Sequence, residues 1–258
     1  MTQINHQWRI TKYNPDFRDE DGYYTLVKEW TCPSEIGKTI NGNKFTIEEY
    51  LRVEAAYVET VIQFLIDSKR NTLRILRLNK VDISQEDKCS ALYELGFEDV
   101  KLEEDAVVTI KEIRTISKMI LRNFLSCEFY SKDEFFVHFG WDYYMYIGTS
   151  DNSLSAIDFA KRSGLFVEPF TSPYNLSEED TIRSVEWNEI AADSKIIVGG
   201  EELNAVPLDE YRRIFNLSEE HPVIGQFDIT VERKDFFQRL LKHKMDFTTY
   251  DYFFIGES

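Results

Sequence analysis

Residues 135–148 read FFVHFGWDYYMYIG, and this stretch decides the class of fold. Successive side chains of a strand point to opposite faces of its sheet. Both alternating sets before the glycine are almost entirely apolar or aromatic: Phe135, Val137 and Phe139 on one face, Phe136 and His138 on the other. Two such faces are typical of strands in the covered interior of a sheet. We therefore expect a central hairpin with a tight turn at Gly140 and Trp141, where Gly140 supplies a positive φ.

The alternation continues past the turn. Tyr144, Met145 and Ile147 are expected to be strand residues with little exposure. The C-terminal sequence TTYDYFFIG echoes the WDYYMYIG of the hairpin. The echo predicts paired central strands in similar surroundings.

The rest of the chain alternates between helical and strand patterns. The clearest helix runs from a Thr46 cap to about Lys69, because Glu49 completes a capping box and apolar residues recur at helical spacing. Further helices are expected at 84–95, 107–125, 153–164, 208–215 and 232–245, with a short one capped by Ser177. Strands are expected at 6–13 and 23–31 as a first hairpin, and at 71–78, 97–102, 165–169, 195–198 and 226–230, with a turn at Gly199 and Gly200. This order predicts an α+β fold with a mixed, mostly antiparallel sheet and helices packed on it.

The patterns place a division of the chain near residue 126. It gives an N-terminal α/β half at 1–125 and a C-terminal α+β half at 126–258 built on the 135–148 hairpin. No linker rich in proline, glycine or serine separates the halves. We therefore expect them to pack together, and the pattern is also compatible with one continuous domain.

The composition excludes several classes of function. The 258 residues carry a net charge of −16, which disfavours binding to nucleic acid or to an anionic membrane and suits a basic protein partner. No apolar run is long enough to cross a bilayer, and the first residues lack the apolar segment of a signal peptide. The three cysteines are widely spaced and form no zinc pattern. These features predict a cytoplasmic protein with free thiols.

Recognisable catalytic and cofactor motifs are absent from the sequence. There is no phosphate-binding glycine loop, no Gly-x-Ser-x-Gly elbow and no HExxH pair. We therefore expect no cofactor and no metal, and we favour a protein that is not an enzyme.

Glu54 is the one local contradiction in the first long helix. It lies within the apolar stripe, four residues after Tyr50 and four before Val58. A buried carboxylate must be paired, protonated or open to a cavity. We expect it to pair with an arginine of the 74–77 strand or with a tyrosine hydroxyl, and the alternative is that it lines a ligand cavity.

Three residues of the hairpin are further candidates for a polar core or a ligand site: His138, Asp142 and Tyr144. His138 is the only histidine inside a predicted core element. With Glu54, Asp142 or Cys127 it offers an acid–base or nucleophile set if the fold brings them together.

A line of cations lies on the helix expected at 107–125. Lys111, Arg114, Lys118 and Arg122 recur at steps of three and four residues, so they lie on one side of the helix. They are candidates for binding an external anion. The alternative is that they pair with acids of this chain.

Two functions follow from these observations. The first is a non-enzymatic, acidic, cytoplasmic protein of bacterial type that binds another protein, such as an immunity or inhibitor protein for a basic toxin or nuclease, since an acidic surface steers such encounters. The second is an enzyme or small-ligand sensor with a pocket around Glu54, His138 and the hairpin tyrosines.

Overall fold

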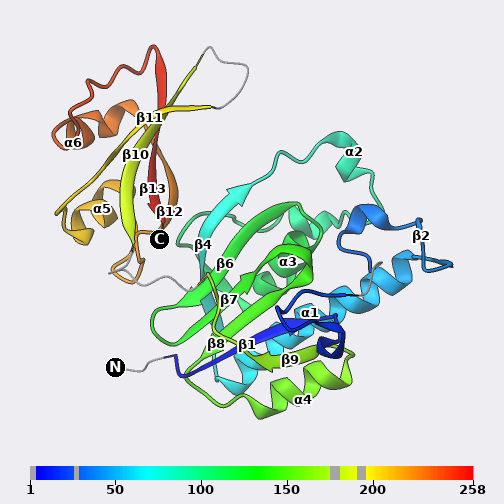
Figure 1. Ribbon diagram of the computed structural model, residues 1–258. Helices are drawn as coiled ribbons and strands as arrows, with labels where there is room; N and C mark the ends of the chain where they lie inside the picture. Colours follow the sequence, from blue (N-terminus) through cyan, green and yellow to red (C-terminus); the bar gives the residue numbers. More distant parts are fainter. Residues whose placement is uncertain (1–3, 26–28, 175–180, 191–195, 258) are drawn as a thin grey trace. The chain divides into compact units, whose positions relative to one another are not determined.

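The computed structural model describes residues 4–25, 29–174, 181–190 and 196–257 (Figure 1). The chain forms two compact units, Met1–Tyr174 and Asn175–Ser258. Each unit has its own antiparallel sheet, and helices pack on one face of that sheet. The predicted α+β class is confirmed. The helix expected at Ser177 lies outside the described residues.

The boundary between the units falls after residue 174 and not near 126. Strand β4 (Thr72–Lys80) pairs antiparallel with β6 (Leu125–Ser131), with Ile75 opposite Phe129. A division near 126 would cut this ladder. Strands on both sides of the predicted division therefore belong to one sheet.

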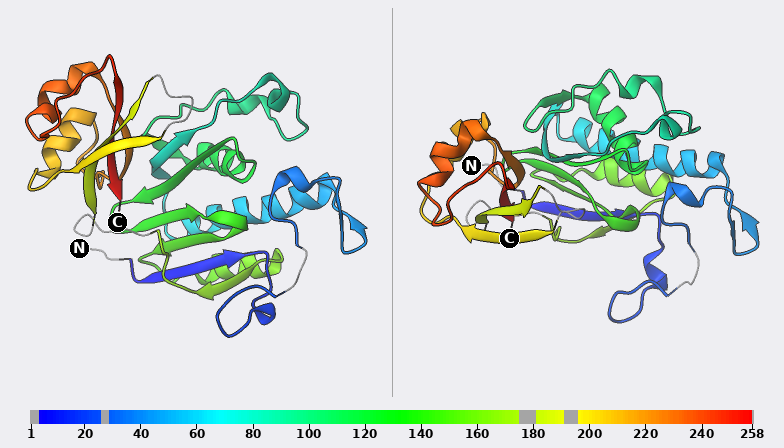
Figure 2. Two further views of the ribbon diagram at one scale, coloured as in Figure 1. Left: turned by 45° about the horizontal axis from the view of Figure 1, so that its top comes forward. Right: turned by 90° about the horizontal axis from the view of Figure 1, so that it is seen from above.

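The first unit is built on seven strands in the order β5-β4-β6-β7-β8-β1-β9. Besides β4 and β6, the strands are β1 (His6–Thr11), β5 (Val107–Thr109), β7 (Phe135–Phe139), β8 (Met145–Thr149) and β9 (Phe166–Pro169). The helices are α1 (Ile47–Asp67), the short α2 (Gln85–Lys88), α3 (Ile110–Leu121) and α4 (Leu154–Arg162), and a small separate ribbon is formed by β2 (Thr39–Ile40) and β3 (Asn43–Lys44). Figure 2 shows α1, α3 and α4 on one face of the seven-stranded sheet, where the apolar core lies.

Local signals explain where the two long helices begin. The Thr46 side chain accepts a hydrogen bond from the backbone N–H of Glu49, as expected for α1. Thr109 and Glu112 form a full capping box at the start of α3, three residues later than predicted. Residues 107–109 form β5 instead, because they pair with the first residues of β4.

The central hairpin is confirmed as a buried element. Met145 and Ile147 have no exposed surface, and β7 and β8 pair with Val137 opposite Ile147. The connection is longer than predicted, since residues 140–144 join the strands. Gly140 has a φ of −86°, and the left-handed residues are Asp142 and Tyr143. Tyr144 lies just before β8 and is only half-buried.

The second unit has four strands in the order β11-β10-β13-β12. They are β10 (Ile182–Glu189), β11 (Ile197–Glu202), β12 (Gly225–Ile229) and β13 (Tyr250–Glu257), with helices α5 (Leu208–Phe215) and α6 (Lys234–Gln238). β13 is central here and β8 is central in the other sheet, so the two echoing sequences do not pair with each other. Gly199 is not in a turn. It lies within β11 under the Trp187 indole, where a Cβ would come within 2.5 Å of the ring.

Other predicted elements are corrected by tertiary contacts. β1 pairs with β8 and β9, so the hairpin expected at 6–13 and 23–31 does not form, and residues 26–28 lie outside the described part. The helix expected at 84–95 ends at Lys88, and the strand at 97–102 is replaced by a short 3-10 turn at Leu95–Phe97. The helix expected at 232–245 ends at Gln238, whose side chain bonds the turn that follows at His243 and Met245.

We predict that Ile147→Ala lowers the free energy of unfolding by about 2–4 kcal/mol, because it leaves a cavity in the fully buried centre of the sheet. Urea denaturation measures the change. Ile66→Ala is the matched control: Ile66 is 53% exposed on α1, so the same truncation should change stability by less than about 0.5 kcal/mol. Equal effects of the two substitutions would contradict the central place of the hairpin.

Candidate functional site

The first unit contains a cleft of about 700 Å³ beside the end of the central hairpin. One wall is formed by residues 125–128 of β6 and the other by residues 139–145 of the hairpin. The rest of the lining includes the end of α3, the β4 residue Arg77, Tyr57 of α1 and Tyr174. This volume lies in the usual range for ligand sites, roughly 300–1,000 Å³.

The cleft exists because two neighbouring strands separate. β6 and β7 pair at three positions only, and the last pair is Phe129 opposite Val137. β6 continues to Leu125 beside β4, and β7 continues to Phe139 beside β8. The sheet is therefore split between Leu125–Glu128 and the far end of the hairpin.

Tyrosine hydroxyls hold the 140–144 loop against the helices. The Tyr143 hydroxyl donates to the carbonyl of Leu121 at the end of α3, at 2.9 Å. The Tyr57 hydroxyl of α1 donates to the carbonyl of Tyr143 at 2.6 Å. The Tyr50 hydroxyl of α1 also donates to Leu121, at 3.1 Å. The bonds of Tyr143 and Tyr57 fix the loop to the two helices, and the bond of Tyr50 joins α1 to the end of α3.

The anchored loop presents a large aromatic side chain to solvent. Asp142 and Tyr143 both have left-handed φ values, 54° and 62°, which cost conformational energy in residues other than glycine. Tyr143 points inward and is buried, whereas Trp141 is 85% exposed. The Asp142 carboxylate is also exposed. Backbone strain at a ligand-sized cleft is a feature of functional sites.

A half-buried ion pair forms the floor of the cleft. Arg77 lies within a bulge of β4, between Leu76 and Asn79, and has a left-handed φ of 55°. Its Nη1 donates to Oε1 of Glu128 at 3.0 Å. The other carboxylate oxygen of Glu128 is buried without a hydrogen bond and lies 3.4 Å from Nε2 of His138. Bulges often re-aim a side chain next to a functional site.

Burial determines the protonation states of Glu128 and His138. Desolvation raises the pKa of Glu128 to about 7, against the opposing effect of Arg77. Desolvation also lowers the pKa of His138 to about 3, and the nearby charge of Arg77 acts in the same direction. His138 is therefore neutral at pH 7. Its Nδ1 lies 2.9 Å from the Ser172 hydroxyl, so its hydrogen bond ties the 170–174 segment to the sheet.

Glu54 lies on α1 and does not line the cleft. It is buried, as predicted, but its partner is Arg122 and not an arginine of β4. Two hydrogen bonds of 2.6 Å join the carboxylate to Nε and Nη2 of Arg122. Burial opposes the charge of the guanidinium, but its hydrogen bonds to Glu54 and the nearby charges of Glu54 and Glu94 outweigh burial and raise the pKa of Arg122. Glu54 belongs to the helical side, and His138 to the opposite face of the sheet, so the fold does not bring the predicted pair together.

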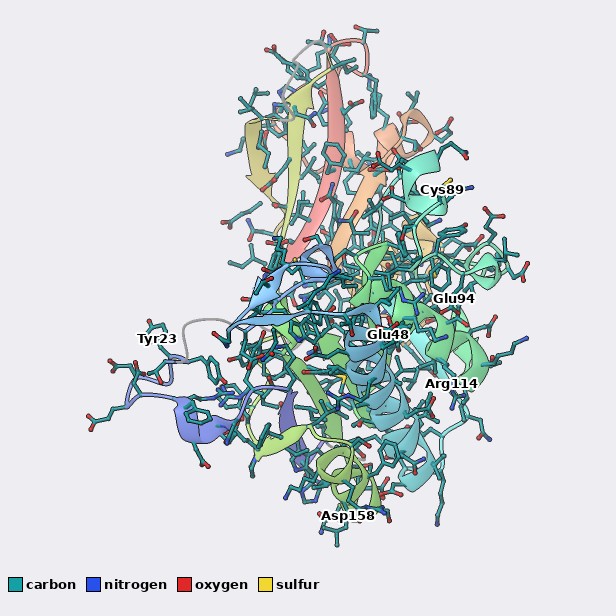
Figure 3. All side chains as sticks on the ribbon, turned by 90° about the vertical axis from the view of Figure 1, so that its right-hand side faces the viewer. Tyr23, Glu48, Cys89, Glu94, Arg114 and Asp158 are labelled. Carbon is teal, nitrogen blue, oxygen red and sulfur yellow. The ribbon has the colours of Figure 1, made fainter. Side chains whose placement is uncertain are left out.

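The cationic line on α3 is largely paired with acids of the same unit. Arg114 bonds Glu59 through two nitrogens, and Lys118 bonds Glu94. Figure 3 shows Arg114 and Glu94 close to α3. Arg122 is buried and contacts both Glu54 and Glu94. Lys111 is exposed at the start of the helix. Pairing within the unit accounts for three of the four cations.

Sequence reasoning missed two residues of the cleft floor, Arg77 and Glu128. The available signal was Glu128 itself, since it is a carboxylate inside the apolar strand LSCEFYS. Asp142 and Tyr144 do line the cleft, as candidates from the sequence, and Trp141 beside them was assigned only to the turn. Cys127 lines it too, and burial raises the pKa of its thiol, which disfavours a nucleophilic thiolate.

The described residues contain neither a metal-binding cluster nor a membrane-spanning helix. No group of three histidine, cysteine or acidic side chains is placed to hold a metal ion there. Within the same ranges, no helix has both the length and the apolar character needed to span a bilayer. The three cysteines, Cys32, Cys89 and Cys127, are free thiols.

Comparison with known proteins adds one finding. Residues 182–254 match the model of a family described as a domain of unknown function (DUF7683). The match runs from the start of β10 into β13, and so lies within the second unit. Neither a curated protein nor a solved structure matches the chain. The cleft belongs to the first unit, outside the matched residues.

We predict that Glu54→Gln lowers the free energy of unfolding by about 3 kcal/mol, because it removes the charge that compensates the buried Arg122. Chemical denaturation measures the loss. Glu59→Gln is the control on the same helix: the Glu59–Arg114 pair is more than a third exposed, so its loss should cost less than about 1 kcal/mol. A Glu54→Gln protein as stable as the control would show that the buried pair contributes little.

We predict opposite pH dependences for Glu128→Gln and His138→Gln. The folded pKa of Glu128 is raised from 4.5 to about 7, so its contribution to stability is present below pH 4.5 and is lost as pH rises to about 7. The folded pKa of His138 is lowered from 6.5 to about 3, so its contribution is present above pH 6.5 and is lost as pH falls to about 3.

Urea denaturation between pH 3 and pH 8 tests both signs. The stability of the wild type minus that of Glu128→Gln should fall with rising pH between 4.5 and 7, by up to about 1.4 kcal/mol per unit. The corresponding difference for His138→Gln should rise between pH 3 and 6.5. If both stability differences changed with pH in the same direction, the assignment of charges to Glu128 and His138 would be wrong.

Proposed function

We propose that this chain is an acidic, non-enzymatic protein that binds a basic partner protein through the 140–144 loop of its first unit, in the manner of an immunity or inhibitor protein. The observation that carries the proposal is Trp141. Its side chain is 85% exposed, yet it stands on a loop fixed by buried hydrogen bonds at Tyr143. A rigid, exposed tryptophan next to a cleft has the properties of a binding hot spot, because little conformational entropy is lost when a partner covers it.

Charge supports a basic partner. The net charge of −16 attracts a cationic protein over distances of about a Debye length. At the loop itself, the Asp142 carboxylate is exposed next to Trp141. Arg77 is hydrogen-bonded to Glu128 in the cleft floor, whereas Asp142 is an exposed acid of the lining. A lysine or arginine of the partner would meet a carboxylate and an aromatic ring at one place.

A second candidate function is a small-ligand sensor or an enzyme that uses the same cleft. It is favoured by the buried Glu128 and His138, since perturbed pKa values in a cleft mark functional sites in many proteins. Glu54 has no part in it, because Arg122 saturates its carboxylate on the other side of the sheet.

We expect Trp141→Ala to weaken capture of the partner by roughly 30-fold or more, because truncating a hot-spot residue costs about 2 kcal/mol or more. The measurement is affinity capture from the native host by the immobilised protein, followed by a titration with the protein that is retained. Leu95→Ala is the matched control, since Leu95 is also 85% exposed but lies outside the cleft lining. Thermal melts should show both variants folded.

The retained protein should be basic, and its binding should weaken as salt increases. Two outcomes would contradict the proposal. One is equal capture by the wild type and Trp141→Ala. The other is retention of a small compound that is turned over or released, which would support the second candidate.

A further inference from the structure

We infer that the split between β6 and β7 receives an extended segment of the partner protein as an added strand. The inference rests on the proposed function and specifies how the partner binds. Strand addition needs unpaired backbone groups in line with a sheet, together with pockets for alternate side chains. The register of β6 and β7 ends at Phe129 opposite Val137, and the cleft lies between Leu125–Glu128 of β6 and the end of β7.

The backbone of β6 faces the split at Cys127. Ile75 of β4 exchanges hydrogen bonds with residues 105 and 106, so its backbone groups point away from β6. In an antiparallel ladder the bonded side alternates from residue to residue. Leu76 therefore bonds Glu128, its partner in the register, and Cys127 points its N–H and carbonyl to the other side, toward β7.

The backbone of β7 faces the split at Phe139. The N–H of Gly140 donates to the carbonyl of Tyr144 at 2.7 Å, on the side of β8. By the same alternation, Phe139 points its N–H and carbonyl toward β6. Continued register would place Cys127 opposite Phe139, but the ladder ends one bonded pair earlier. Backbone groups of buried strands are almost always paired, so an added strand is the simplest way to continue the ladder beyond Phe129 and Val137.

The two sides of the split define the side chains of the incoming strand. On the helical side the lining is apolar and aromatic, with Tyr57, Ile120 and Leu121. On the opposite side it is polar, with Arg77, Glu128 and the ring of Tyr174. A strand places alternate residues on opposite faces. The occupant is therefore a segment in which apolar residues alternate with polar ones.

The length and charge of the segment also follow. The open stretch of β6 is four residues, Leu125–Glu128, or about 13 Å at roughly 3.3 Å per residue. Asp142 is an exposed acid of the lining, so one polar position should be basic. We therefore assign the split to a segment of four or five residues that alternates β-branched and polar residues and contains an arginine or a lysine.

A synthetic probe tests the inference on the whole chain. It is the acetylated, amidated pentapeptide Val-Thr-Val-Arg-Val, and its control carries N-methyl groups on the second and third valines. Methylation removes backbone donors and leaves the side chains and the charge almost unchanged. Binding is followed by the fluorescence of Trp141, with the Trp141→Phe protein as the blank, and by amide hydrogen exchange measured by NMR.

We expect the pentapeptide to bind, and the amides of Cys127 and Phe139 to exchange at least tenfold more slowly in its presence. The amides of Phe129 and Val137 already lie in the ladder, so they serve as internal references and should change little. The N-methylated peptide should bind at least tenfold more weakly. Replacing the arginine of the probe by glutamate should also weaken binding.

Three results would overturn strand addition: no binding of the probe, binding without protection at Cys127 and Phe139, or equal binding of the N-methylated peptide. The wider proposal is judged separately by the capture experiment. If Trp141→Ala loses a basic partner while the probe protects neither amide, the partner binds the surface of the loop, and the split is not its site.

Discussion

The end of helix α3 is the point on which the rest of the first unit depends. A helix terminus leaves carbonyls without partners inside the helix, and burial makes an unmet carbonyl costly. Here Leu121 accepts from two tyrosine hydroxyls, Tyr50 of α1 and Tyr143 of the hairpin loop. The next residue, Arg122, has its charge met by Glu54 of α1. The end of α3 thus joins α1, the hairpin loop and Glu54, the acid within the apolar stripe of α1.

This anchoring explains why the sheet is split. The loop that follows β7 is bonded to the end of α3 by Tyr143 and not to β6, and the ladder between the strands ends at Phe129 and Val137. Opening a sheet in this way exposes backbone groups and lets Glu128 and His138 occupy positions that a continuous sheet would fill with apolar side chains. The cost is visible in the shifted pKa values of both groups. The cleft, the strained loop and the exposed Trp141 are therefore consequences of one connection.

The sequence predicted those features that depend on neighbours in the chain. The Thr46 cap and the apolar stripe placed α1, and the two-sided apolar pattern placed the central hairpin. Contacts between residues far apart in the chain determine the ion pairs, the ends of several helices and the length of the hairpin connection. Glu54 finds its partner 68 residues away, and Arg122 carries no local sign that it turns inward. The helix expected at 84–95 ends early because Leu92 and Glu94 bond Arg122 and Lys118 of α3. The turn at Gly140 could not be predicted, since its length depends on a hydroxyl that reaches another helix.

Most of the candidate site likewise depends on contacts between residues that are far apart in the chain. Asp142 and Tyr144 were found because they flank an obvious hairpin, whereas Arg77 and Glu128 meet only after a bulge in β4 turns the arginine across the sheet. A bulge of this kind has no reliable local signature in the residues around Arg77.

An open strand edge is also a hazard, because any extended chain can pair with it. The first unit limits the hazard by recessing the edge between α3, the 140–144 loop and Tyr174, so that only a short segment with the right alternation of side chains fits. Selectivity in this cleft would then come from the walls, and affinity from the backbone and from Trp141.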